Sequence, residues 1–174
     1  MLINAHCLKE QVIEPTLKYL NDLNESTVDL LLGTAALESN LSPLTEGSSE
    51  TKGIGLFNIS PQSHTDVWDK YLAFDPDLAS KIRGLASQRS FLTNPHTELS
   101  TNLAYATAIA WCIYRRSSVS LKAKESIQNL SLCWNAHYRQ PNSTYNSTDF
   151  CHRYDKLISG DSMDKFEDQA VSAA

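Results

Sequence analysis

Apolar positions recur at helical spacing along most of this 174-residue chain, which predicts a mainly α-helical fold. In the segment 8–20 the pattern is helical, and Pro15 either breaks the run or starts a second helix. A third helix is expected to start near Ser26, an N-cap residue, and to run through the apolar stretch "LLLGTAAL". It should end before Pro43, because the residue ahead of a proline avoids helical geometry. Further helices are expected at residues 64–71, 77–86, 98–116, 126–138 and 150–158.

The segment "TEGSSETKGIGLFNISP" interrupts this pattern, because it is first polar and then glycine-punctuated, apolar and short. Such a sequence predicts a loop followed by a turn or a small hairpin near residues 53–59. Loops are also expected at "LTNPH" and "RQPNSTYNST". We therefore expect a single mainly α domain over residues 1–158, with a small β-hairpin or turn. Residues 159–174 are polar and acidic, and they predict a flexible tail or a linker.

Composition narrows the possible partners. The formal net charge is −5 and the sequence pI is about 5.5, so the chain lacks the basic footprint of a nucleic-acid-binding protein. No apolar stretch approaches the roughly 20 residues that a membrane-spanning helix needs, so we expect no membrane insertion. The opening "MLINAHCLKE" does not have the pattern of an ordinary secretory signal. The four cysteines form no C-x-x-C pair and do not suggest a disulfide framework.

The most informative position is Glu38, a carboxylate at the end of the apolar third helix. The C-terminal end of a helix carries partial negative charge, and apolar neighbours desolvate a charged group. Both effects raise the pKa of a carboxyl group, so Glu38 would keep its proton near neutral pH. Cleavage of a glycosidic bond needs such an acid, because the leaving sugar oxygen must be protonated. The alternative is an ordinary solvated charge at a helix end.

Four segments around Glu38 resemble the motifs of the soluble lytic transglycosylase family, in order and in spacing. "ALESNLSP" (36–43) resembles the Glu-Ser motif, and "GLFNISP" (55–61) resembles the Gly-Leu-Met-Gln-Ile-x-Pro segment. "NLAY" (102–105) resembles a helix that opens with Asn, and "WNAHY" (134–138) stands at the Tyr-Asn-Ala-Gly motif. These enzymes have a lysozyme-like fold, are related to goose-type lysozyme and cut bacterial peptidoglycan. The resemblance implies that fold and that activity here.

By this resemblance, Glu38 would be the catalytic acid and base. It would protonate the β-1,4 glycosidic oxygen between N-acetylmuramic acid and N-acetylglucosamine. As a carboxylate it would then take the proton of the muramic acid C6 hydroxyl, which attacks the anomeric carbon and closes a 1,6-anhydro ring. This reaction needs no water and no second carboxylate, whereas the usual glycosidase needs two. We expect no metal and no cofactor.

The resemblance also implies five substrate-binding residues. Asn135 is expected to hold the N-acetyl group, and Ser39 to bond the sugar near the reacting centre, although its hydroxyl could equally bond its own backbone. Asn58 stands where the family has a substrate-contacting Gln. Trp134 replaces a Tyr and offers only an N–H donor, so Tyr138, or else Tyr105, would supply the missing hydroxyl; Trp134 could equally be a core residue.

Three other interpretations stay open. A lysozyme-type hydrolase would need a second carboxylate, and the candidates are Glu46, Glu50, Asp66 and Asp69. A metal site could use Cys133, His137, Cys151 and His152, although their spacing is not a familiar one for zinc. The chain could also be a non-catalytic domain that binds glycan strands or serves as a structural part of a virion.

The setting follows from the expected substrate. Peptidoglycan lies outside the cytoplasmic membrane, and the sequence carries no secretory signal. We therefore expect a bacteriophage protein, either virion-associated or released as an endolysin, that acts in the periplasm or cell wall of the host. Its partners would be glycan strands and other virion proteins.

Overall fold

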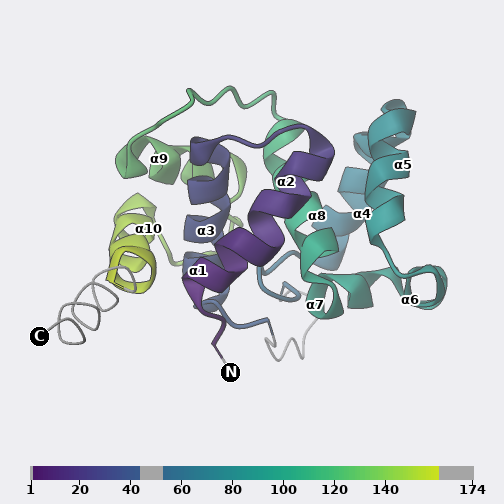
Figure 1. The fold of residues 1–174 in the computed structure, drawn as a ribbon, viewed down its shortest axis with the longest axis horizontal. Coiled ribbons are helices and arrows are strands. Elements are labelled where there is room, and N and C mark those ends of the chain that lie inside the picture. The colour runs from purple at the N-terminus through teal and green to yellow at the C-terminus, as the bar shows by residue number, and fades with distance from the viewer. Residues whose placement is uncertain (1, 44–52, 161–174) are drawn as a thin grey trace, which may run out of the picture.

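The computed structural model describes residues 2–43 and 53–160, and this part of the chain is mainly helical (Figure 1). The α-helices are α1 (Ala5–Leu8), α2 (Glu14–Leu20), α3 (Glu25–Ser39), α4 (Pro61–Lys70), α5 (Pro76–Leu85), α6 (Gln88–Thr93), α7 (Glu98–Thr101), α8 (Leu103–Arg115), α9 (Ile127–His137) and α10 (Ser147–Tyr154). Shorter helical turns are η1 (Lys9–Ile13), η2 (Leu72–Phe74), η3 (Pro95–Thr97) and η4 (Asp155–Ser159).

The first helical run is continuous from α1 through η1 to α2. Pro15 lies in the first turn of α2, directly after the π-helical turn η1, so it starts a second helix and does not break the run. The run ends at Asn21, whose φ of 63° places it in the left-handed region that Asn tolerates.

Helix α3 is the central element of the fold. It packs against α9 and α10, and it also contacts η1 of the first helical run and α8 (Figure 1). Every residue from Ser26 to Leu37 except Asp29 is buried, as expected for a helix that is apolar on all sides. The predicted start was two residues late, because the N-cap is Asn24, whose Oδ1 accepts the Thr27 N–H at 2.8 Å.

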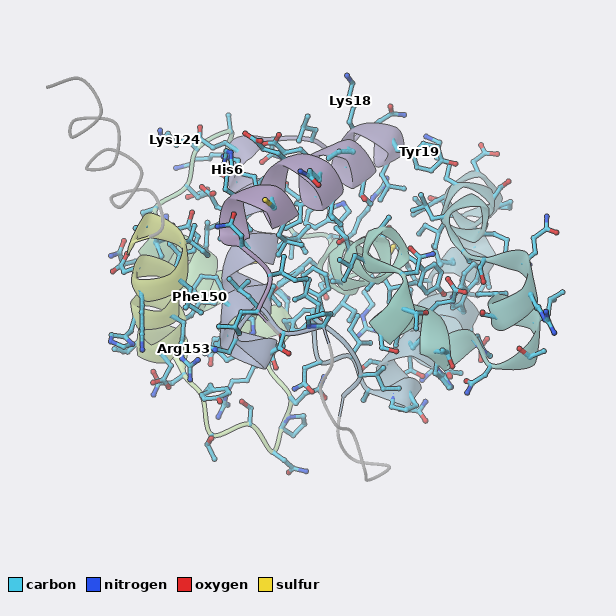
Figure 2. The ribbon with its side chains drawn as sticks, turned by 60° about the horizontal axis from the view of Figure 1, so that its bottom comes forward. His6, Lys18, Tyr19, Lys124, Phe150 and Arg153 are labelled. Carbon is cyan, nitrogen blue, oxygen red and sulfur yellow. The ribbon has the colours of Figure 1, made fainter. Side chains whose placement is uncertain are left out.

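Helix α10 packs closely on α3 through a small residue. A Cβ atom at Gly33 would lie only 2.2 Å from Cζ of Phe150, so the ring fills the space that glycine leaves. Phe150 points from α10 toward α3 in Figure 2. The start of α10 is fixed by a capping box between Asn146 and Asp149. Residue 33 therefore sets how near α10, and the loop before it, can approach the end of α3.

Three predictions for the region after residue 85 were wrong in detail. The last helix, expected from residue 150, begins at Ser147, inside the expected loop. The expected single helix at 98–116 is broken at Asn102, whose Oδ1 caps α8 by accepting the Tyr105 N–H at 3.1 Å. Asn competes with the helical backbone for hydrogen bonds, which explains the break. The expected loop at 92–96 is partly helical, because α6 continues to Thr93 and η3 begins at Pro95.

The small β element near residues 53–59 is confirmed as a single antiparallel bridge between Ile54 and Ile59. Its turn needs left-handed backbone at Gly55, with φ of 71°, and at Asn58, with φ of 49°. A Cβ atom at Gly55 would lie 1.9 Å from the carbonyl oxygen of Leu99, so the turn also packs directly on α7.

The expected boundary after residue 158 falls one residue before the end of η4 at Ser159, so the first residues of the predicted tail at 159–174 are helical. Residues 161–174 of that tail lie outside the described residues. Among the residues that are described, none of the helices has the length and apolar character needed to cross a membrane.

The Gly33–Phe150 contact makes a testable prediction. Replacing Gly33 with Ala should lower the free energy of unfolding by about 1–3 kcal/mol, because overpacking forces α10 away from α3. Gly84→Ala is the matched control, since a Cβ there would meet only the Tyr19 hydroxyl at 3.2 Å and should change stability by less than about 1 kcal/mol. Urea unfolding of both variants measures the difference. Equal effects of the two substitutions would contradict this account of the packing.

Candidate active site

The Glu38 carboxyl lies at the C-terminal end of α3 and faces an open pocket of about 290 Å³. The chain turns away from the helix directly afterwards, because Asn40 and Leu41 both adopt left-handed backbone, with φ of 55° and 58°. Arg153 of α10 donates to Oδ1 of Asn40 and ties this turn to the neighbouring helix (Figure 2). The end of α3 therefore points Glu38 in a fixed direction.

Two N–H donors hold the carboxylate. The Asn58 side-chain amide donates to Oε2 of Glu38 at 3.0 Å, and the Trp134 indole donates to Oε1 at 3.0 Å. Asn58 belongs to the bridged turn and Trp134 to α9, so three distant segments of the chain meet at one carboxyl group. Each carboxylate oxygen has two acceptor sites, which leaves further sites for a ligand or a proton.

Burial raises the pKa of Glu38 above its ordinary value, and the hydrogen bonds from Asn58 and Trp134 lower it only in part. The direction is the one expected from the sequence, and desolvation is its largest cause. Buried in this way, the group keeps a proton to a higher pH than a solvated glutamate does. It can then donate that proton to a bound ligand and stay held by the same two donors as a carboxylate.

Most of the described residues that line the pocket have polar side chains, and few of these are charged. The lining residues are Glu38, Gly53, Asn58, Ser60, Gln140, Pro141, Asn142, Ser143, Thr144 and Tyr145. Glu38 is the one ionisable acid or base among them apart from the Tyr145 phenol. The walls offer amides, hydroxyls and backbone groups, which pair with a neutral, hydrogen-bonding ligand better than with a strongly charged one.

Of the five predicted substrate-binding residues, the structure brings Asn58 and Trp134 to Glu38. Asn58 lines the pocket, as expected. Trp134 has 0% exposure and lies behind the carboxylate, so it holds the acid and is not open to a sugar. The prediction that it lies in the sugar cleft is corrected accordingly: the indole is both a core residue and a donor to Glu38.

Tyr138 is also corrected. Its ring is buried and stacked on Tyr114, and its hydroxyl donates to the carbonyl oxygen of Phe57 at 2.7 Å. Tyr138 does not line the pocket, and its hydroxyl is already bonded to a carbonyl oxygen inside the protein. This bond ties α9 to the turn that carries Asn58. The other candidate hydroxyl, that of Tyr105, is engaged elsewhere, where it accepts the Trp68 indole N–H at 2.9 Å and contacts His64 at 2.6 Å.

Ser39 and Asn135 do not reach the pocket. The Ser39 hydroxyl donates to the carbonyl oxygen of Ala35 at 3.0 Å, which is the backbone bond that the sequence left open as an alternative. Asn135 is exposed and lies outside the pocket walls, so its expected place on the cleft wall is wrong. Consecutive helical side chains diverge, and since Trp134 points inward, Asn135 points away from it.

Of the four candidate second carboxylates, the two that the structure describes lie away from the Glu38 pocket. Asp66 pairs with Lys70 at 2.9 Å and accepts the Gln62 amide at 2.8 Å, and Asp69 is exposed on α4. Neither lines the Glu38 pocket. Glu46 and Glu50 lie outside the described residues.

The candidate metal ligands do not assemble in the described part of the chain. Cys133 and His137 line a different pocket, and Cys151 contacts the carbonyl oxygen of Ile127 at 4.0 Å. Across residues 2–43 and 53–160 no group of three or more His, Cys, Asp or Glu side chains could hold a metal ion. All four cysteines are free thiols, and burial raises the pKa of Cys133 to about 11.

The sequence did not single out the loop that lines much of the pocket. Residues 140–145 supply six of the ten lining residues that belong to the described part of the chain. The segment was predicted as a loop only, although its run of amides and hydroxyls ending in an aromatic residue follows directly after the last motif. That composition, directly after a candidate catalytic motif, was the signal in the sequence that could have indicated a pocket-lining loop.

Comparison with known proteins found no matching family model, no matching curated protein and no matching solved structure.

The raised pKa of Glu38 predicts how Glu38→Gln changes stability with pH. Above that pKa the charged carboxylate destabilises the fold, whereas the amide stays neutral, so the melting temperature of Glu38→Gln relative to that of the wild type should rise between pH 4 and pH 7. The prediction concerns this change with pH, because glutamine offers one acceptor oxygen to the two N–H donors and loses one bond at every pH. Below the ordinary value of 4.5, Glu38 is protonated in both folded and unfolded chains, and the difference should no longer change with pH.

Thermal unfolding followed by circular dichroism between pH 4 and pH 8 measures this effect. Asp69→Asn is the matched control, because Asp69 is exposed and lies away from the pocket. A stabilisation by Glu38→Gln that does not depend on pH would contradict the assignment.

Proposed function

We propose that this chain is a lysozyme-like domain that cleaves peptidoglycan as a lytic transglycosylase, with Glu38 as acid and base. One observation carries the proposal: a desolvated carboxyl with a raised pKa faces an open polar pocket and is held by Asn58 and Trp134. Glu38, Asn58 and Trp134 come from three of the four segments that resemble the family's motifs.

The chemistry follows from the proton on Glu38. Protonated Glu38 donates to the glycosidic oxygen as the bond from that oxygen to the anomeric carbon of N-acetylmuramic acid breaks. The resulting carboxylate accepts the N–H groups of Asn58 and Trp134, which stabilise its charge. It then takes the proton of the C6 hydroxyl as that oxygen bonds to the anomeric carbon. The proton count returns to its starting value, and the product carries a 1,6-anhydro ring.

The pocket supports a sugar ligand. Glycan strands present hydroxyl and N-acetyl groups, which are neutral hydrogen-bonding partners for the Asn58, Ser60 and Gln140 side chains on the walls. The described lining has no Lys or Arg, so it offers no charge partner for a phosphate. Glu38 is the one carboxylate of that lining, and a single carboxylate is enough for the transglycosylase reaction.

The fold is compatible with this proposal. The described chain is helical with one bridged turn, and the turn brings Asn58 to the end of α3. That the helices are arranged as in lysozyme is part of what we propose. The bacteriophage setting expected from the sequence stays a prediction.

In the decisive experiment, purified peptidoglycan is digested with the wild type, with Glu38→Gln and with the control Asp69→Asn. The products are analysed by mass spectrometry. We expect 1,6-anhydro-muropeptides from the wild type and the control, and at least a thousandfold less from Glu38→Gln. Reducing-end products would instead identify a hydrolase and direct attention to Glu46 and Glu50. If the wild type releases no products under conditions where a known muramidase does, catalysis is rejected, and a glycan-binding or structural domain is the remaining interpretation.

The indole donor makes a separate prediction. Trp134→Phe removes an N–H that stabilises the Glu38 carboxylate, so the pKa of Glu38 should rise further. Activity needs the protonated acid and is lost as pH rises through that pKa, so the alkaline limb of the pH–rate profile should move to higher pH. Trp111→Phe is the matched control, because the Trp111 indole donates to Asp22 at 2.9 Å, away from the pocket. An alkaline limb that moves equally in both variants, or in neither, would contradict this role.

A further inference from the structure

We propose that residues 139–145 form the sugar-stacking wall of the Glu38 cleft, with the Tyr145 ring as the platform and Arg139 as the positioning residue that holds it. This inference rests on the proposed function, because it assigns the surface on which a pyranose ring of the glycan lies. The sequence pointed to neither residue.

The loop is part of the same pocket as the acid. Residues 140–145 and Glu38 line one cavity of about 290 Å³, and Tyr145 is at its rim with 36% exposure. The loop begins where α9 ends, since the Arg139 N–H donates to the carbonyl oxygen of Trp134 at 3.0 Å. Segment 134–145 therefore supplies both a donor to Glu38 and a wall of the cleft.

Arg139 holds the loop by a two-pronged contact. Its Nε donates to the carbonyl oxygen of Tyr145 at 2.7 Å, and its Nη2 donates to the carbonyl oxygen of Ser143 at 2.8 Å. The planar guanidinium can make both bonds at once, whereas a lysine ammonium is a point charge on a flexible stem. Two further bonds tighten the loop: the Tyr145 N–H donates to the Ser143 hydroxyl at 3.2 Å, and the Ser143 N–H to the Gln140 carbonyl oxygen at 3.0 Å.

None of these four bonds uses the Tyr145 side chain: two use the Tyr145 backbone, and the other two use the backbones of Ser143 and Gln140. No ring–ring contact involves Tyr145 in the part of the chain that the structure describes, whereas the buried Tyr138 is stacked on Tyr114. A ring at the rim of a polar pocket, fixed at its backbone and open at its side chain, is arranged for a ligand. Tyr145→Phe keeps the ring and Tyr145→Ala removes it, so comparing the two variants tests the ring itself.

A glycan is the ligand that fits. The C–H groups on one face of a β-linked pyranose make that face apolar, and they pack on the electron-rich face of an aromatic ring. The hydroxyl and N-acetyl groups at the edges of the sugar then reach the amides and hydroxyls of Asn142, Ser143 and Thr144. Tyrosine suits this position because its ring packs while its hydroxyl stays in water.

The test uses soluble glycan strands freed of their peptides, titrated into Glu38→Gln so that no cleavage occurs, with binding followed by isothermal titration calorimetry. Adding Tyr145→Ala should raise the dissociation constant about three- to tenfold, while Tyr145→Phe should bind like its parent. Circular dichroism at the titration temperature should show both variants folded, so that the loss of binding by Tyr145→Ala reports the loss of the ring. Arg139→Lys should weaken binding to a similar extent, since the ring loses its fixed position.

Kinetics with the otherwise wild-type chain separate this role from a general structural one. Tyr145→Ala and Arg139→Lys should raise KM for the same strands severalfold with little change in kcat, and the alkaline limb set by Glu38 should not move. Equal binding and equal KM for Tyr145→Ala and the wild type would overturn the inference, and so would absence of glycan binding by the Glu38→Gln parent. Binding that depends on Tyr145, with no cleavage by the wild type, would support this wall and reject the proposed catalysis.

Discussion

The site depends on one constraint: a carboxyl group is placed at a half-buried helix end, where its charge must be compensated. Desolvation makes an unpartnered carboxylate costly, and the N–H groups of Asn58 and Trp134 reduce that cost without cancelling it. The two donors come from different segments, so α9 and the bridged turn must both dock correctly on α3. Two contacts away from the pocket support that docking. The ring of Phe150 packs on both Gly33 of α3 and Trp134 of α9, and the Tyr138 hydroxyl donates to the Phe57 carbonyl oxygen of the turn.

The segment from Trp134 to Tyr145 links the acid to the rest of the cleft. Its helical part carries the buried indole that contacts Glu38, and its loop lines the open pocket that Glu38 faces. Arg139 stands between the two parts and bonds to both: its backbone to α9 and its guanidinium to the loop. This short segment thus combines a buried indole, which affects the pKa of Glu38, with a solvent-exposed loop whose side chains can bind a ligand.

Helix types and approximate positions could be predicted because they depend on local periodicity. The exceptions were places where a single polar side chain changes the backbone: Asn24 starts α3 early, and Asn102 divides the expected helix at 98–116 by capping α8. The site was predictable in part for a similar reason. Glu38 and Asn58 stand out by type and spacing, whereas Ser39, Asn135 and Tyr138 were assigned to a cleft whose direction the sequence does not contain.

The sequence by itself determined that the chain is mainly helical, that a small β element follows residue 52, and that Glu38 ends an apolar helix. These properties follow from the order of apolar and polar residues and from the backbone preferences of Gly, Pro and Asn. Only the tertiary structure decided which side of each element faces Glu38. It placed Trp134 behind the acid, turned Asn135 away and brought the loop at 140–145 into the pocket. Directions of this kind are set by how helices pack on one another, and that packing depends on contacts between residues far apart in the chain.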